Sequence, residues 1–253
     1  LLDFIKFAKL FDEVDLDFKK IKKLLSKNSQ LNDLIEILDI YDTKIASIYP
    51  LEDFSLCSDR DYKTTILKNF QLMLEYSIKL ESNLIVVNPS ILNTSIDINS
   101  IPKWRIINRT TKRLQEISKR AYKEDINVGF EFSTQKGSSI TTLKEAKEVL
   151  KPLESQENLG YIIDTFHIGI LKLDFNEIKE ILNFIYLIKL ADFNDNSPEN
   201  QKRLFPGQGS FDFNKFYRFL EKLSYNKTFS IELSQYKCSE TLLEKFSAIF
   251  KKV

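Results

Sequence analysis

The chain alternates short apolar runs with longer amphipathic segments. The runs are rich in Ile, Val, Leu and Phe, which is typical of parallel strands that are covered on both faces. We therefore predict seven strands, at residues 13–18, 43–49, 83–88, 127–132, 160–165, 184–192 and 227–233.

The segments between these runs have the 3.6-residue spacing of amphipathic helices. Pro102 stands near the start of one of them, where proline is tolerated, and we expect Ser138 and Ser139 to cap the next one. The apolar face of the helix predicted at 62–80 carries Ile66, Phe70, Met73, Leu74 and Ser77. The full set of predicted helices is 1–9, 62–80, 101–124, 141–150, 213–223 and 239–250.

Strands that alternate with helices predict βαβ units and a parallel sheet. No glycine-rich dinucleotide loop follows any predicted strand, and the chain has only six glycines, which favours a closed barrel over an open doubly wound sheet. The common barrel has eight strands, and a helical segment at 1–9 directly precedes the first predicted strand. We therefore expect an α/β fold, a (β/α)8 TIM barrel whose first strand precedes Leu1. A barrel that truly lacks one strand is the alternative.

Composition restricts the partners. Lys and Arg number 37 against 36 Asp and Glu, so the net charge of +1 gives no general attraction for nucleic acid or an anionic membrane. No apolar stretch reaches the length of about 18 residues that a membrane span needs, and the first residues lack a signal-peptide pattern. Cys57 and Cys238 have no metal-type spacing and predict reduced thiols in a cytoplasmic protein.

In three of the last four predicted strands, a carboxylate stands one residue before the end. In a barrel, the chemistry lies at the carboxyl ends of the strands. The alternation of side chains places these carboxylates on the same face as Gly129, Ile162 or Ser230 of their own strands. If those faces point inward, the carboxylates converge at the mouth of the barrel, where burying them together is costly unless a metal or a positive side chain lies among them. The three residues are Glu131, Asp164 and Glu232.

Other polar residues accompany these strand ends. His167, the only histidine, follows Asp164 by three residues and is a candidate for proton transfer near pH 7. Lys189 and Asp192 end the sixth predicted strand. The segment 203–213 is either a turn that caps the next helix or a rigid loop over the mouth that aims Arg203 at an anionic or polyhydroxy substrate.

The order and spacing of five short motifs resemble the xylose-isomerase-like TIM-barrel superfamily. This superfamily comprises sugar phosphate isomerases and epimerases and is related to endonuclease-IV-type proteins. The resemblance runs from Leu1 to about residue 250 and implies a single domain over residues 1–253. The motifs are Phe130-Glu131-Phe132, Asp164-Thr165-Phe166-His167, Lys189-Leu190-Ala191-Asp192, Pro206-Gly207-Gln208-Gly209 and Ser230-Ile231-Glu232.

The resemblance implies a divalent metal (Mn, Mg or Zn) held by a Glu, an Asp, a His or Gln, and a Glu from successive late strands. Glu131, Asp164 and Glu232 match three of these ligands. The two glutamates are also expected to exchange protons with the substrate through an enediolate. His167 is expected at the substrate, Arg203 at the substrate oxygens, and Asp192 is a further candidate for substrate binding.

The sequence departs from this pattern at Lys189, which replaces the His or Gln ligand. A protonated lysine has no lone pair to give a metal, and neighbouring carboxylates favour the protonated form. Two outcomes are open. Lys189 replaces the charge of the metal through salt bridges, which we favour, or it turns away and leaves a weak carboxylate-only metal site.

The leading hypothesis is an isomerase or epimerase of a small sugar or hydroxy-carbonyl compound. Glu131 and Glu232 would act as acid and base, and Lys189 with His167 would stabilise the enediolate. A dehydratase or lyase shares the first step. The alternative from another class is a non-catalytic barrel that binds a sugar-like ligand after losing its metal site. An abasic-site endonuclease is disfavoured, because that branch uses several histidines at a multi-zinc site.

The expected partner is a small carbohydrate, with no nucleic acid and no membrane. A homo-oligomer stays open, because relatives often associate.

Overall fold

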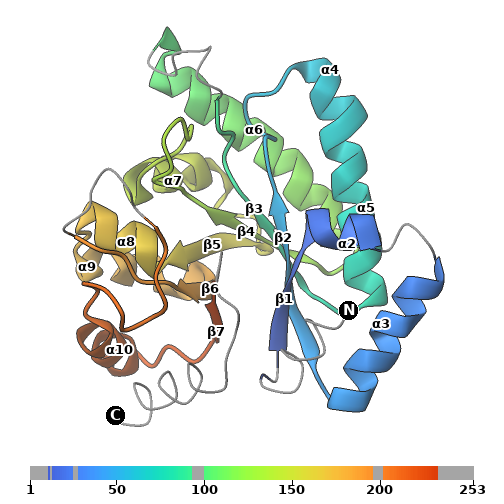
Figure 1. Ribbon diagram of the computed structural model, residues 1–253. Coiled ribbons are helices and arrows are strands. Elements are labelled where there is room, and N and C mark those ends of the chain that lie inside the picture. Colours follow the sequence, from blue (N-terminus) through green and yellow to red (C-terminus); the bar gives the residue numbers. More distant parts are fainter. Residues whose placement is uncertain (1–10, 12, 25–27, 93–99, 196–201, 233–253) are drawn as a thin grey trace. The chain divides into compact units, whose positions relative to one another are not determined.

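The structure is a computed structural model that describes residues 11, 13–24, 28–92, 100–195 and 202–232. The chain divides into two compact units, Leu1–Gly160 and Tyr161–Val253. Figure 1 shows that each unit combines strands with helices. A single domain over residues 1–253 therefore stays a prediction. None of the helices in the described ranges combines the length and the apolar character needed to cross a membrane.

The first unit contains a parallel sheet whose strands pair in sequence order. All four residues of its third strand are buried, as the unbroken apolar run predicts. The predicted strands are confirmed to within about two residues at each end. They are β1 (Glu13–Asp17), β2 (Lys44–Leu51), β3 (Leu84–Val87) and β4 (Asn127–Glu131).

Helices of the first unit pack on these strands: α5 lies against β2 and β3, and α6 lies against β4. The apolar face predicted at 62–80 is buried, although a π-helical turn at Tyr62–Ile66 precedes α5. The helices α2 and α3 were not predicted. The unit contains α2 (Phe18–Leu24), α3 (Asn28–Tyr41), α4 (Asp59–Asp61), α5 (Leu67–Lys79), α6 (Lys103–Tyr122), α7 (Leu143–Leu150) and the 3-10 turn Lys151–Leu153.

The prediction that Ser138 and Ser139 cap α7 was wrong. The helix begins at Leu143, and Thr142 caps it by accepting a hydrogen bond from the backbone N–H of Glu145 at 3.2 Å. The chain continues as a loop beyond the serines, and Ser139 is buried, with its hydroxyl 3.2 Å from that of Ser55.

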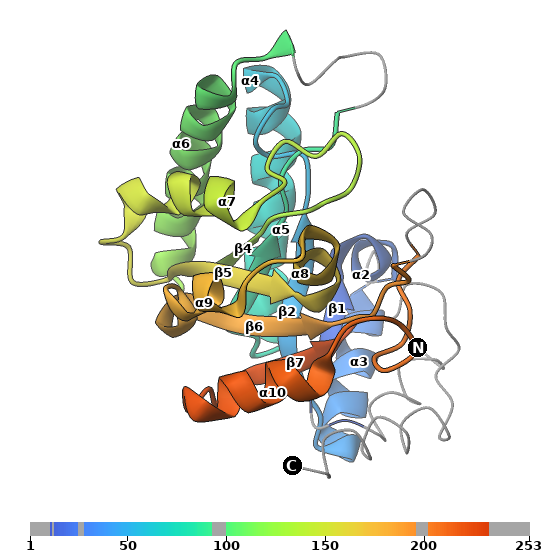
Figure 2. The ribbon, with the colours of Figure 1, turned by 90° about the vertical axis from the view of Figure 1, so that its left-hand side faces the viewer.

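The second unit pairs β5 with β6 and β6 with β7, again in parallel. Figure 2 shows α10 lying beside β7, and Figure 1 agrees. Asp212 caps α10, because its Oδ1 accepts a hydrogen bond from the backbone N–H of Lys215 at 2.9 Å. The elements are β5 (Leu159–Asp164), α8 (Thr165–Leu171), α9 (Phe175–Lys179), the 3-10 turn Leu182–Phe184, β6 (Ile185–Leu190), α10 (Phe213–Lys222) and β7 (Thr228–Ile231).

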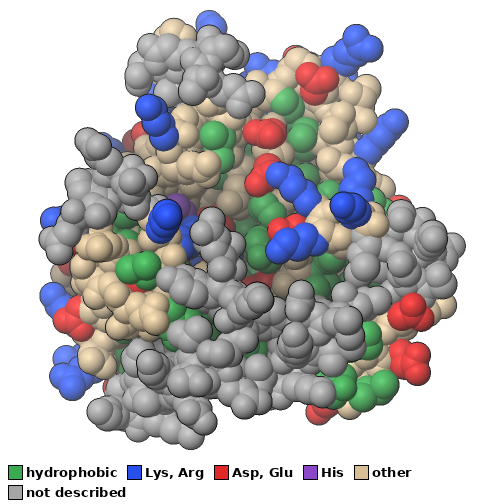
Figure 3. Space-filling model, in the orientation of Figure 1, with side chains coloured by type: hydrophobic (Ala, Val, Ile, Leu, Met, Phe, Trp, Pro, Cys, Tyr) green, Lys and Arg blue, Asp and Glu red, His purple; other side chains and the backbone are tan. Residues whose placement is uncertain are grey.

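Two of these helices, α8 and α9, were not predicted, because both are short and α8 follows β5 without an intervening loop. The predicted helices at 1–9 and 239–250 lie outside the described residues, and so does a strand before Leu1. Figure 3 shows basic and acidic side chains interspersed over the described part of one face, in keeping with the net charge of +1.

Candidate active site

Strand β5 ends at Asp164, a buried carboxylate that also begins the next helix. Its Oδ1 accepts a hydrogen bond from the backbone N–H of Phe166 at 2.8 Å, so Asp164 is the N-cap of α8. Its Oδ2 accepts a hydrogen bond from the guanidinium of Arg203 and forms an ion pair with it. Both oxygens of this carboxylate are therefore held, one by a helix terminus and one by a cation.

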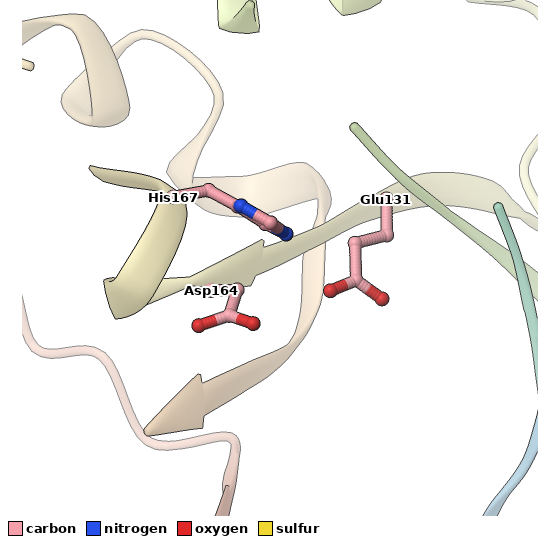
Figure 4. A group of neighbouring side chains, drawn as sticks. All are labelled: Glu131, Asp164 and His167. Atoms are coloured by element: carbon pink, nitrogen blue, oxygen red, sulfur yellow. The ribbon is translucent and has the colours of Figure 1, made fainter. Parts of the chain in front are cut away.

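His167 is the third residue of α8 and lies close to the carboxylate that caps this helix. A ring nitrogen of His167 and a carboxylate oxygen of Asp164 lie within 4.8 Å of each other, and Figure 4 shows both side chains where β5 passes into α8. Burial lowers the pKa of His167 to about 4; Asp164 opposes this shift, and the charge of Arg203 adds to it. The ring is therefore neutral at pH 7.

Arg203 reaches into this group from the segment that follows β6. Besides Asp164, its Nη1 lies 3.5 Å from Oε2 of Glu232, and its Nη2 lies 3.4 Å from Nε2 of His167. The guanidinium also stacks over the ring of Phe166, with 4.7 Å between its carbon and the ring centroid. A planar cation with several donors suits such a position. The histidine bond, with Arg203 donating to Nε2, leaves the proton of the neutral ring on Nδ1.

Adjacent strands bring Lys189 and Glu232 to the same place. In the parallel register, Lys189 of β6 lies opposite Asp164 of β5 and Ser230 of β7. Lys189 is buried, and its Nζ lies 3.4 Å from Oε2 of Glu232, the residue after β7. The side chain of Glu232 is 23% exposed, whereas that of Asp164 is fully buried. Glu232 is thus the more exposed of these two carboxylates, although its Oε2 atom is buried.

The ionisation state of Asp164 follows from these neighbours. Burial acts to raise its pKa, but the charge of Arg203, followed by the effects of His167 and Lys189, outweighs burial and lowers the pKa below its usual value. Asp164 is therefore ionised at neutral pH, between two cations.

The remaining predicted residues lie in two places. Glu131 ends β4 in the first unit and is buried; Figure 4 draws it as well. Asp192 is fully buried in the second unit, and its carboxylate accepts hydrogen bonds from the backbone N–H groups of Phe193, Gly207, Gly209 and Phe211. Its role as a substrate ligand stays a prediction.

The family assignment agrees with this geometry. The sequence profile of the family described as "Xylose isomerase-like TIM barrel" matches residues 6–249. The chain belongs to this family.

The proteins that are similar in sequence to this xylose isomerase-like chain include an inosose isomerase of Bacillus velezensis. It is 24% identical over 211 residues, which cover 82% of this chain and 73% of the relative. The solved structure of an IOLI protein with a bound zinc atom has a TM-score of 0.85 at 22% identity and covers 99% of this chain and 91% of its own. A D-tagatose 3-epimerase-like protein has a TM-score of 0.80 at 19% identity, with coverage of 96% and 90%. The predicted α/β TIM-barrel-like fold is thereby confirmed.

The donors of the second unit fit a divalent metal poorly. Asp164 and His167 offer an oxygen and a neutral nitrogen within 4.8 Å, which is favourable. However, the second oxygen of Asp164 is paired with Arg203, and Oε2 of Glu232 faces both Arg203 and Lys189. A bound ion would have to displace or tolerate two positive side chains in this xylose isomerase-like barrel. The carboxylates here are neutralised by side chains.

Sequence reasoning missed two features of this site. Phe166 supports the guanidinium of Arg203, and an aromatic residue directly before the histidine was the only available signal. His167 was expected at the substrate and not among the metal candidates; its position on α8 could be inferred only once the helix was known to begin at Thr165.

Proposed function

We propose that this protein is an isomerase or epimerase of a small sugar or hydroxy-carbonyl compound. The observation that carries the proposal is the cluster formed by Asp164, Lys189 and Glu232, at the ends of β5, β6 and β7, with Arg203. The reaction needs a carboxylate to remove a proton next to a carbonyl and positive charge to stabilise the oxygen that becomes negative. The names of the relatives, inosose isomerase and D-tagatose 3-epimerase-like protein, support this class of reaction.

Glu131 and Glu232 are the proposed acid and base. Glu131 is a buried carboxylate at the carboxyl end of β4, and strands of a TIM barrel present their carboxyl ends at one mouth. One glutamate takes the proton as the carbon–hydrogen bond breaks, and the electron pair moves onto the carbonyl oxygen to give an enediolate. In an epimerase, a glutamic acid then returns a proton to the opposite face of the same carbon and the carbonyl re-forms. In an isomerase, the proton returns to the former carbonyl carbon, while the hydroxyl proton of the neighbouring carbon passes to the oxygen that became negative, so that the neighbouring carbon becomes the new carbonyl.

Lys189 and Arg203 are the proposed source of positive charge for the enediolate. Both already lie within 3.5 Å of a carboxylate oxygen of Glu232, so a substrate oxygen that enters beside this glutamate meets the same cations. Preorganised charges of this kind are worth far more in a buried site than in water. His167, neutral at pH 7, contributes a hydrogen-bond donor rather than a charge.

Asp164 has a different proposed task. It is fully buried, caps α8 and holds Arg203, so we assign it the positioning of His167 and Arg203. The difference in exposure supports different roles for Asp164 and Glu232, because only the side chain of Glu232 is partly exposed.

A binding protein that performs no proton transfer is the second candidate. The observation that favours it is the pairing of Lys189 with Glu232, because a cation that holds a carboxylate also weakens it as a base. Such a protein would still bind a sugar-like ligand at the same residues.

Solvent deuterium exchange separates the two candidates. We expect deuterium to enter a substrate carbon when the full chain is incubated with inosose or with one of a panel of ketoses. Glu131→Gln and Glu232→Gln should each reduce the rate at least about a hundredfold, whereas Glu148→Gln, a change at an exposed site on α7, should leave it unchanged. Ligand binding without exchange for every compound would identify the binding protein, and loss of water from the substrate would identify a dehydratase.

A further inference from the structure

Asp192, which lies two residues after the end of β6, is a carboxylate enclosed by backbone N–H groups. Its Oδ1 accepts hydrogen bonds from Phe193 at 2.8 Å and from Phe211 at 2.9 Å. Its Oδ2 accepts from Gly207 at 3.1 Å and from Gly209 at 2.8 Å. Among the described residues its charge is balanced by these dipoles, because no ion pair to a side chain is found there. Hydrogen bonds to a charged acceptor are the stronger kind.

The loop of residues 205–211 is shaped around this carboxylate. Gly207 has a backbone φ of +84°, a conformation that residues other than glycine rarely adopt. A Cβ at Gly209 would collide with the carbonyl oxygen of Phe193 and with the carboxylate of Asp192. The Pro-Gly-Gln-Gly motif therefore allows the backbone to approach Asp192 closely enough to hydrogen-bond it.

The same residue is joined to the start of the loop. Asp192 and Leu204 form an antiparallel bridge in which each N–H donates to the other carbonyl at 2.8 Å. Phe205 follows and is buried. Arg203 therefore directly precedes Leu204, whose backbone is fixed by the bridge to Asp192. The loop that follows Leu204 is fixed in turn by its hydrogen bonds to the carboxylate of Asp192.

We propose that Asp192 is the positioning residue that holds Arg203 in the active site, acting through the bridge to Leu204 and the loop of residues 205–211. The guanidinium must reach Asp164, Glu232 and His167 together, and a long side chain keeps such a position only when its backbone is held. The inference rests on the proposed function for its catalytic meaning, but the contacts that carry it belong to the second unit alone. It also explains why a carboxylate predicted to bind substrate has both oxygens engaged by the loop.

The test is Asp192→Asn, which replaces one acceptor oxygen by an NH2 group that faces backbone donors. The readout is the NMR titration of His167, which is unambiguous because the chain has one histidine. The charge of Arg203 is one of the causes that hold the pKa of His167 near 4. If the loop releases Arg203, the pKa of His167 should rise toward its ordinary value of about 6.5, as it should in Arg203→Met. The matched control is Asp212→Asn, at the exposed cap of α10, where asparagine caps equally well.

A titration of His167 in Asp192→Asn that equals the wild-type curve would overturn the proposal. If Asp192→Asn does not fold, Gly207→Ala tests the same loop: a smaller rise in the pKa of His167 supports the proposal, and no rise contradicts it. This readout requires no activity, so it is independent of the proposed function. Where exchange activity is found, kcat/KM should fall about tenfold or more in Asp192→Asn. A rise in KM with an unchanged His167 titration would instead mean direct substrate contact.

Discussion

At the scale of single residues, Lys189 is where the sequence departs from the metal-ligand pattern that the family resemblance implies. It lies on β6, opposite Asp164 of β5 and next to β7. Its side chain is buried, and its Nζ lies 3.4 Å from Oε2 of Glu232. Family resemblance places a metal ligand here, whereas lysine places a positive charge here. A buried ion pair of this kind is weak evidence for stability, but it determines what else the carboxylates can bind.

Replacing this lysine by histidine should create a metal site. In Lys189→His, a neutral imidazole supplies a lone pair and removes one of the two cations that face Glu232. We expect calorimetric titration with Zn²⁺ or Mn²⁺ to give about one ion bound per chain, at least about a hundredfold more tightly than in the wild type. Lys222→His on the exposed surface of α10 controls for the added histidine. Equal affinity in the wild type and Lys189→His would contradict the role given to Lys189.

At the scale of elements, the ends of the strands are held by side chains of the loops that follow them. In the first unit, Ser55 after β2, Ser90 after β3 and Ser139 after β4 form a buried hydroxyl cluster. In the second unit, Asp164 and Asp192 hold the segments after β5 and β6 in a similar way. Such contacts hold the ends of the strands in place.

Removing the hydroxyl of Ser90 from the serine cluster should destabilise the protein. Ser90 accepts hydrogen bonds from the backbone N–H groups of Ser55 at 3.1 Å and Leu56 at 2.9 Å, so Ser90→Ala leaves buried donors without a partner. We expect a loss of about 1–3 kcal/mol in the free energy of unfolding, measured by urea denaturation. In a double-mutant cycle with Ser55→Ala, the two losses should couple strongly. Additive losses would show that the cluster does not act as a unit.

Much of the fold, and part of the site, could be predicted from the sequence. The polar residues that end apolar runs, such as Asp164 and Lys189, could be found because strand periodicity is local. The contacts of Asp192 with the loop could not, because the loop donors are backbone N–H groups 15 to 19 residues farther along the chain. The helix that carries His167 was missed because it starts directly at the strand end, without a turn residue.

At the scale of the whole molecule, the neutral state of His167 links stability to pH. The folded-state pKa is about 4 and the unfolded value about 6.5, so the unfolded chain binds the proton first as the pH falls. The free energy of unfolding should therefore decrease between pH 6.5 and 4, by about 3 kcal/mol from this group. Asp164 does not change the free energy of unfolding in this pH range. Its folded-state pKa is lowered, so the stability that its ionised form provides is lost only at lower pH.

Denaturant unfolding at several pH values measures this contribution. His167→Gln should flatten the curve between pH 6.5 and 4 relative to the wild type. Parallel curves for the two proteins would mean that His167 is not held neutral by burial.

We propose that this barrel transfers protons with side-chain cations in place of a metal. The most direct measurement is deuterium exchange into inosose or a ketose by protein treated with a chelator, with the metal content of the same sample determined by mass spectrometry. We predict that exchange continues at the untreated rate in protein that holds far less than one divalent ion per chain. Exchange that stops on chelation and returns on addition of Zn²⁺ or Mn²⁺ would contradict the claim.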